Sequence, residues 1–245
     1  ESGLIKKIPE IIKNKYHDKK IALITDSNVF ELYGKDLYQC LKNEGLSVVP
    51  IVFNAGERSK NIDELSRIYN KLANNSFTRS DVVIAFGGGV TGDMAGLAAA
   101  TFLRGLGFVQ IPTTLLAMVD SSIGGKVAVD LPQGKNLIGT FYQPDMVYTD
   151  PELLKSLSDK QFSNGMAELI KHGIIRDISL FNSIIDRAAG FNYSALSDTL
   201  DQYIYDSCET KRKIVELDEF DNGIRQLLNF GHTVGHAIEK VENYN

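Results

Sequence analysis

The first 150 residues alternate between two kinds of hydrophobic pattern. Short, nearly continuous apolar runs rich in Val, Ile and Phe are typical of buried strands. They occur at 20–26, 46–53, 81–89, 107–114 and 145–150. Residues 30–45 and 61–75 instead carry apolar residues at three- and four-residue steps, as on a helix with one buried face. Strands alternating with helices favour a parallel sheet covered on both faces, with ligands at the carboxyl ends of the strands.

Residues 151 to 245 show a different pattern, because each extended stretch fits a helix and none fits a strand. The helix-like stretches are 151–158, 159–175, 177–188, 196–216 and 224–241. We therefore predict two domains: an α/β domain with a parallel sheet at residues 1–150 and an all-α domain at residues 151–245. The boundary is expected near Asp150–Pro151.

Composition and charge narrow the class of protein. The chain has 245 residues, of which 43% are hydrophobic and 23% are charged. This composition is typical of globular proteins and excludes a disordered tail, a fibre or a coiled coil. A net charge of −5 gives no general attraction for nucleic acid. The apolar run 94–103 is too short to span a membrane, and ESGLIKKIPE has no signal-peptide core. The two cysteines are far apart in the sequence and indicate no disulfide framework, so we expect a cytoplasmic protein. From its charge and apolar pattern we expect no nucleic-acid or membrane partners.

A glycine-rich loop follows the third apolar run and precedes a stretch of small residues. Gly87, Gly89 and Gly92 match the pattern G-x-G-x-x-G. Glycines let the backbone approach a pyrophosphate, and the N-terminus of the following helix offers free N–H groups to it. The loop favours a dinucleotide site, and the alternative is a tight strand–helix turn without a ligand.

This loop departs from the usual dinucleotide fingerprint, which has an acidic residue about 20 positions further on to bind the ribose. Between Met94 and Val119 the only charged residue is Arg104. We therefore expect the ribose contacts from other segments. The candidates are Asp26 at the end of the first apolar run, Glu57 in AGERSK, and the hydroxyl groups of Thr113 and Thr114.

Two lysines follow glycines in residues 119–139, which the sequence predicts as a flexible polar loop. Lys126 and Lys135 each come directly after a glycine, and Asn136 follows the second lysine. Lysine ammonium groups in such loops bind phosphate or carboxylate. The alternative is a solvated loop whose lysines bind nothing.

Residue types that bind metals stand four positions apart at two places in the helical half. His232 and His236 form one pair, and Glu168 and His172 form the other. Residues at that spacing share one face of a helix, and two imidazoles with one carboxylate suit zinc or a similar cation. The alternative is a helix with packed histidines. Spacing does not decide which histidine binds metal and which transfers protons.

Taken together, these motifs resemble the 3-dehydroquinate synthase family. The matching stretches, in the expected order, are GGGVTGDMAG, RGLGFVQIPTTLLAMVDSSIGGK, LPQGKNLIGTFYQP, NGMAELIKHG and LLNFGHTVGHAIE. The resemblance implies conversion of 3-deoxy-D-arabino-heptulosonate 7-phosphate to 3-dehydroquinate and phosphate in the shikimate pathway, with NAD and a zinc or cobalt ion as cofactors. It also implies a homodimer in which Arg104 reaches the neighbouring subunit's site.

The resemblance also implies a role for each matching residue. The NAD-binding residues would be Asp26, Asn28, Glu57, Lys60, Gly88, Gly89, Val90, Thr91, Gly92, Asp93, Thr113, Thr114, Lys126 and Lys135. The metal ligands would be Glu168 and His232. The catalytic and substrate-binding residues would be Arg104, Asp120, Lys126, Asn136, Lys171, Lys211, Arg225, Asn229 and, as the acid–base histidine, His236.

The sequence departs from the family pattern in two ways. The family's third metal-binding histidine and a later substrate-binding lysine would lie beyond Asn245, so we expect the chain to be a piece of a longer enzyme. Asp221 stands where the family usually has Glu. The alternative functions are a sister cyclase of the 2-deoxy-scyllo-inosose or valiolone type, a metal-dependent polyol dehydrogenase, and a non-catalytic NAD-binding fragment.

Overall fold

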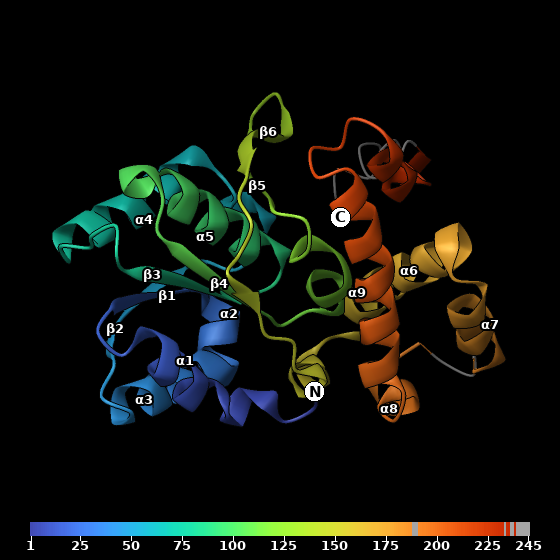
Figure 1. Cartoon of the computed structure of the whole chain (residues 1–245), viewed down its shortest axis with the longest axis horizontal. Helices are drawn as coiled ribbons and strands as arrows, with labels where there is room; N and C mark the ends of the chain where they lie inside the picture. The colour runs from blue at the N-terminus through green and yellow to red at the C-terminus, as the bar shows by residue number, and fades with distance from the viewer. Residues whose placement is uncertain (188–190, 233, 236–237, 239–245) are drawn as a thin grey trace.

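A parallel sheet forms the centre of the structure, which is a computed structural model describing residues 1–187, 191–232, 234–235 and 238. The sheet has five strands in the order β2–β1–β3–β4–β7 (Figure 1). They are β1 (Lys20–Asp26), β2 (Ser47–Phe53), β3 (Val82–Gly87), β4 (Gly107–Pro112) and β7 (Met146–Val147). The predicted fold class, a parallel α/β sheet, is confirmed. The apolar run at 145–150 forms only the two-residue edge strand β7.

Helices cover both faces of this sheet, because successive residues of a strand point to opposite sides. Leu23 and Ile84 belong to one hydrophobic core, and Ile24 and Val83 belong to the other. The first core is covered by α1 (Ile8–Tyr16) and α3 (Lys35–Asn43), the second by α4 (Ile62–Asn74) and α5 (Gly89–Thr101) (Figure 1). A short helix α2 (Ser27–Val29) and a π-helix (Phe30–Gly34) connect β1 to α3.

An antiparallel hairpin stands where the sequence predicted a flexible loop. Its strands are β5 (Lys126–Leu131) and β6 (Gly134–Phe141). Val127 and Val129 of β5 are buried in the core that contains α5, whereas β6 is exposed along most of its length. An exposed strand buries no face and so carries no alternating hydrophobic pattern, which is why the prediction of a loop was wrong here.

The second half of the chain is helical, and the described residues after Pro151 contain no strand. Its elements are a 3-10 helix (Pro151–Ser156), α6 (Asp159–Arg176), α7 (Ile178–Asp186), α8 (Tyr193–Leu196), α9 (Leu200–Leu217) and a second 3-10 helix (Ile224–Asn229). The stretch 224–241, predicted as one helix, begins as this 3-10 helix, and much of its remainder lies outside the described residues. Among the described residues, no helix combines the length and apolar character needed to cross a membrane.

A continuous hydrophobic core joins the helical half to the sheet. It runs from Ile111 of β4 through Leu115 to Met166 of α6. Gly165 of α6 lies so close to Leu115 that a Cβ on this glycine would stand 2.5 Å from the leucine Cβ. This contact brings α6 next to the segment that leaves the carboxyl end of β4, where ligands of parallel sheets bind.

Candidate functional site

The first cavity lies at the carboxyl ends of β1, β2, β3 and β4 and has a volume of about 840 Å³. We call it the strand-end cavity. The residues predicted to bind NAD that line it are Asp26, Asn28, Glu57, Lys60, Gly88, Gly89, Val90, Thr91, Asp93, Thr113 and Thr114. Of the other three, Gly92 is buried behind the cavity wall, Lys135 forms an ion pair with Glu57 at 3.4 Å, and Lys126 lines a second cavity.

The glycines of the loop serve two different purposes. Gly88 is the N-cap residue of α5, and no side chain caps this helix end, so first-turn N–H groups are left for a ligand. A Cβ on Gly88 would lie 3.1 Å from Cγ2 of Thr114, across the cavity wall. A Cβ on Gly92 would instead stand 2.8 Å from Oε1 of the buried Gln110, so that glycine serves packing. The uncapped helix and the glycine cradle fit the pyrophosphate of a dinucleotide.

Asp26 is fixed in the wall of the strand-end cavity by its own hydrogen bonds. Its Oδ1 accepts hydrogen bonds from the backbone N–H of Asn28 at 2.9 Å and of Val29 at 3.0 Å, which caps α2. Its Oδ2 accepts a hydrogen bond from the hydroxyl of Thr91 at 3.4 Å. A carboxylate has about four lone-pair sites, so Asp26 keeps acceptor capacity for a ligand hydroxyl.

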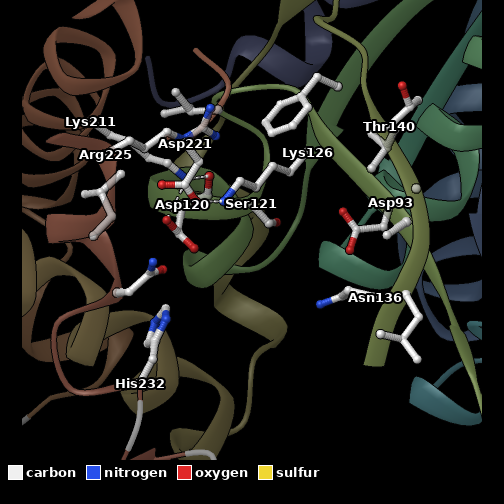
Figure 2. A pocket seen from close by; sticks show the side chains of 18 of the residues that line it. Asp93, Asp120, Ser121, Lys126, Asn136, Thr140, Lys211, Asp221, Arg225 and His232 are labelled. Atoms are coloured by element: carbon white, nitrogen blue, oxygen red, sulfur yellow. Dashed lines mark hydrogen bonds and ion pairs between the residues drawn. The ribbon is translucent and has the colours of Figure 1, made fainter. Parts of the chain in front are cut away.

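The second cavity, with a volume of about 730 Å³, lies between the hairpin and the helical half (Figure 2). We call it the cationic cavity, because four side-chain cations line it. Its lining residues come from α5, the π-helix Ala117–Ser121 and the turn after it, the hairpin, α6, α9 and the segment 221–232. The predicted substrate- and metal-binding residues on its wall are Asp120, Lys126, Asn136, Lys171, Lys211, Arg225, Asn229 and His232.

Lys211 and Asp120 form a buried ion pair between α9 and the π-helix. The ammonium group lies 2.6 Å from Oδ1 of Asp120 and donates a hydrogen bond to its backbone carbonyl at 2.5 Å. Burial by itself raises the pKa of Asp120, but the charge and hydrogen bond of Lys211, together with Lys171 and His172, lower it to about 2. Asp120 is therefore ionised at neutral pH, and it fixes the direction of the Lys211 ammonium.

Arg225 and Lys126 connect the helical half to the hairpin region. Arg225 is 2% exposed and donates hydrogen bonds from Nη2 to the carbonyl of Gly124 at 2.9 Å and from Nη1 to the carbonyl of Glu219. Lys126 forms an ion pair with Oδ2 of Asp221, whose backbone φ is +58°. Oδ1 of Asp221 is buried and has no hydrogen-bond partner. These contacts fix two cations in the wall of the cationic cavity (Figure 2).

Asp93 lies between the two cavities and lines both of them. It forms an ion pair at 2.6 Å with the buried Lys60, which also donates a hydrogen bond to Oδ1 of Asn136 at 2.5 Å. Burial raises the pKa of Asp93 to about 6, against the opposing charge of Lys60. This connection joins a residue of the strand-end cavity to the hairpin that covers the cationic cavity.

Glu168 of α6 stands at the centre of a group of potential metal ligands. Its Oε1 lies 3.8 Å from Nε2 of His232, and its Oε2 forms an ion pair with Lys171. One ligand atom each from Asp120, Glu168 and His172 also lie within 4.8 Å of one another. Carboxylate and imidazole donors brought together in this way fit a borderline divalent cation such as Zn²⁺ or Co²⁺.

His172 is the buried member of this group. Its Nδ1 lies 2.6 Å from Oγ of Ser207 on α9, and its Nε2 is buried without a hydrogen-bond partner. Burial lowers the pKa of His172 to about 4, so the ring is neutral near pH 7. The sequence drew attention to His172 only through its four-residue distance from Glu168.

Some predicted site residues lie elsewhere, and some wall residues were not predicted. Arg104 lines neither cavity, and it follows Leu103 in a turn where both residues have positive φ, 68° and 50°. His236 lies outside the described residues. Sequence reasoning missed Ser121, which lines both cavities, and Ser207, which lines neither but contacts His172, because no local motif marks either serine.

Comparison with solved structures identifies the class of protein. A 2-deoxy-scyllo-inosose synthase complexed with carbaglucose-6-phosphate, NAD⁺ and Co²⁺ aligns with a TM-score of 0.89 and 28% identity, over 98% of this chain and 65% of that one. A 2-epi-5-epi-valiolone synthase from Streptomyces hygroscopicus with NAD⁺ and Zn²⁺ bound aligns with a TM-score of 0.89 and 25% identity, over 98% and 66%. The fold therefore defines a relative of the sugar phosphate cyclases.

Sequence comparison identifies the family within this class. Residues 50–164 match the family model for the 3-dehydroquinate synthase N-terminal part, and residues 165–245 match the model for its C-terminal part. A 3-dehydroquinate synthase from Clostridium acetobutylicum is 50% identical over 244 residues, which cover all of this chain and 68% of that protein. The chain belongs to the 3-dehydroquinate synthase family, and it spans about two thirds of that relative's length.

Proposed function

We propose that this chain carries the NAD- and metal-binding site of an enzyme that converts 3-deoxy-D-arabino-heptulosonate 7-phosphate to 3-dehydroquinate and phosphate. The observation that carries the proposal is the convergence of Lys126, Lys171, Lys211 and Arg225 on one cavity. The substrate bears a carboxylate and a phosphate, and a chain of net charge −5 needs a local group of cations to bind such an anion.

We assign the two cofactors to different parts of the chain. The α/β part, residues 1–150, would hold NAD in the strand-end cavity, and the helical part, residues 151–245, would hold the metal ion through Glu168 and His232. When bound, NAD⁺ would accept a hydride from the carbon of a substrate CH–OH group, and the cation would polarise the oxygen of that group as its hydroxyl proton leaves. The cavities share Asp93 and Ser121 on their walls, which supports hydride transfer between neighbouring ligands.

The residues of the chain bind and orient the substrate through the remaining steps. Arg225 and the three lysines would neutralise its phosphate and carboxylate, and Asn136 and Asn229 would hydrogen-bond its hydroxyl groups. His236 would move a proton during phosphate elimination, which the new ketone makes easier. The substrate then takes the hydride back, its ring opens, and an intramolecular aldol reaction closes the carbocycle without net oxidation.

Arg104 supports a homodimer in this proposal. Its turn has an exposed Leu103, and Arg104 lines neither cavity of its own chain. An arginine that serves the site must then serve the site of a second copy. Mixing inactive Arg104→Ala and inactive Lys126→Ala chains should restore part of the activity, because a mixed dimer contains one intact site. A mixture as inactive as its two components would contradict this arrangement.

The function is tested by following phosphate release from 3-deoxy-D-arabino-heptulosonate 7-phosphate with catalytic NAD⁺, with and without a chelator. The assay uses this chain beside a version extended to the length of its relatives. We expect release that needs NAD⁺, stops with chelator and leaves no NADH. Lys126→Ala should weaken substrate binding far more than NAD⁺ binding. The matched surface variant Lys13→Ala, which removes only an ion pair with Glu44, should change neither.

The alternative outcomes separate the rival functions. Accumulation of NADH would indicate a polyol dehydrogenase. Phosphate release from sedoheptulose 7-phosphate or glucose 6-phosphate, and none from the proposed substrate, would indicate a sister cyclase. No turnover by either version with any of these substrates would leave a binding role and reject the proposal.

A further inference from the structure

One carboxylate outside both cavities holds the segment that brings Arg225 to the cationic cavity. Asp218 directly follows α9 and lines neither cavity. Its Oδ1 accepts a hydrogen bond from the backbone N–H of Asn222 at 3.0 Å. Its Oδ2 accepts hydrogen bonds from the backbone N–H of Gly223 at 2.7 Å and of Arg225 at 3.0 Å. Three backbone donors of the loop 218–225 therefore converge on a single side chain.

The second 3-10 helix needs this carboxylate because its own N-cap residue is a glycine. The helix runs from Ile224 to Asn229, and Gly223 has no side chain that could accept hydrogen bonds from the first turn. The free N–H groups at the start of a helix are usually bonded by the side chain of an N-cap Ser, Thr, Asp or Asn. Asp218, five positions before the glycine, supplies that oxygen instead.

The backbone of Asp218 is bonded to the last turn of α9. Its N–H donates hydrogen bonds to the carbonyls of Ile214 at 3.1 Å and Val215 at 3.2 Å, and both of these side chains are buried. The hydrogen bond from Asn222, with those from the two other backbone donors, lowers the pKa of Asp218 against the effect of burial. Asp218 therefore joins α9 to the 3-10 helix as an ionised carboxylate at neutral pH.

The loop 218–225 carries two charged groups of the cationic cavity. Asp221 forms an ion pair with Lys126, and the buried Arg225 donates a hydrogen bond to the carbonyl of Gly124 at 2.9 Å. Arg225 fits closely in its place, because a Cβ on Gly124 would stand 2.3 Å from Nη2 of the arginine. A displacement of the loop would therefore move both charged groups away from their partners.

We propose that Asp218 is a positioning residue for the substrate, because its hydrogen bonds fix the loop 218–225 with the side chains of Asp221 and Arg225 at the cationic cavity. The inference rests on the proposed function, since it concerns cations assigned to that substrate. Asp218 acts through these two residues and lines no part of the cavity itself. Its effect comes from the oxygen atoms that accept the backbone N–H groups.

Two substitutions at position 218 separate hydrogen bonding from charge. Asp218→Asn keeps one oxygen, which can accept the hydrogen bonds from Gly223 and Arg225, whereas Asp218→Ala keeps none. We expect Asp218→Ala to raise the KM of phosphate release by about tenfold, with a smaller change in kcat. The affinity for NAD⁺, measured by fluorescence titration with NADH, should stay unchanged. Asp218→Asn should stay within about threefold of the parent KM, because it loses only the bond from Asn222.

A carboxylate elsewhere on α9 provides the matched control. Asp206 accepts a hydrogen bond from the side chain of Gln202 at 2.8 Å and lines neither cavity. Asp206→Ala should therefore change neither KM nor NADH affinity. An unchanged KM in Asp218→Ala would overturn the proposal. A KM as high in Asp218→Asn as in Asp218→Ala would also overturn it, because the charge and not the hydrogen bonds would then be responsible.

A second measurement needs neither turnover nor a variant that folds. In the NMR spectrum of the unmodified chain, the backbone N–H groups of Gly223 and Arg225 should exchange with solvent far more slowly than in an unfolded chain, although Gly223 is exposed. Exchange of both groups at the unfolded rate would overturn the proposal. The side-chain N–H signals of Arg225, identified by their absence in Arg225→Lys, should shift in Asp218→Ala and stay in place in Asp218→Asn.

These two measurements separate the inference from the proposed function. Phosphate release with the same KM in the parent chain and in Asp218→Ala would reject the positioning role and keep the function. Shifted Arg225 signals in Asp218→Ala, without phosphate release in any version of the chain, would keep Asp218 as the residue that positions Arg225 and reject the proposed substrate.

Discussion

The two cavities are built in different ways, although they share a wall. The strand-end cavity lies at the carboxyl ends of four neighbouring strands, where the glycines at the start of α5 are part of its wall. The cationic cavity is lined by charged side chains from several segments spread between residues 93 and 232. Where glycines form the wall, binding should fail when atoms are added, whereas a wall of paired charges should fail when atoms are removed.

The largest expected effect comes from removing one charge of the cationic cavity. Asp120→Asn leaves the ammonium of Lys211, whose side chain is 7% exposed, without its counter-charge. Breaking a buried ion pair from one side costs about 3 kcal/mol of stability. Urea unfolding should show this loss, and phosphate release should fall with it because Lys211 is no longer oriented.

A double variant provides the control for this pair. Asp120→Asn combined with Lys211→Met removes the unpaired charge, so it should recover most of the stability but none of the activity. If the double variant were as unstable as Asp120→Asn alone, the two side chains would not be energetically coupled. The cationic cavity would then not depend on paired charges.

The next effect concerns pH and the wall shared by the cavities. The pKa of Asp93 is about 6 in the folded chain against an ordinary value of 3.8, so the folded state holds the proton more tightly. The resulting stabilisation is fully present below about pH 4 and is lost as the pH rises toward 6, with a total of about 3 kcal/mol. Urea unfolding at pH 4 and pH 7, without ligands, measures it.

Asp93→Asn isolates this contribution from other titrating groups. The variant cannot ionise at position 93, so its unfolding free energy should fall less than that of the parent chain between pH 4 and pH 7. The groups that act on Asp93, which are Lys60, Glu57 and Asp130, remain in place. An identical pH dependence in both chains would mean that Asp93 is ionised throughout this range.

The same contrast explains which parts of the molecule the sequence could predict. The glycine loop is one continuous motif after a buried strand, so its position at a strand end followed from hydrophobic pattern alone. The hairpin was missed because Leu137 and Ile138 are exposed and β6 buries no face. The contact of His172 with Ser207 joins residues 35 positions apart on different helices, and no local motif specifies it.

Alanine substitutions should have smaller effects, and these should distinguish a glycine that contacts a ligand from a glycine that allows close packing. A Cβ on Gly88 would lie 3.1 Å from Thr114, at the cavity wall, whereas one on Gly96 would overlap Val127 and stand 3.0 Å from Phe108. Gly88→Ala should weaken NAD⁺ binding by about tenfold with little loss of stability. Gly96→Ala should cost about 1–3 kcal/mol by overpacking and leave NAD⁺ affinity unchanged. Fluorescence titration with NADH and urea unfolding measure both quantities, and similar profiles for the two variants would contradict this division.

The smallest expected effect comes from replacing Lys171, which should strengthen binding of the divalent cation and reduce turnover of the substrate. Lys171, 7% exposed, places its ammonium against Oε2 of Glu168, where it competes with a divalent cation for the same carboxylate. Lys171→Met should therefore tighten Co²⁺ binding by up to about tenfold, worth 1.4 kcal/mol, while phosphate release falls because a substrate cation is lost. Lys160→Met, at an exposed position in the first turn of the same helix, should change neither.

Weaker Co²⁺ binding in Lys171→Met would mean that the lysine holds Glu168 in place for the cation rather than competing with it. The charges of the cavity and the ligands of the cation would then form one cooperative unit, and removing any member should weaken both.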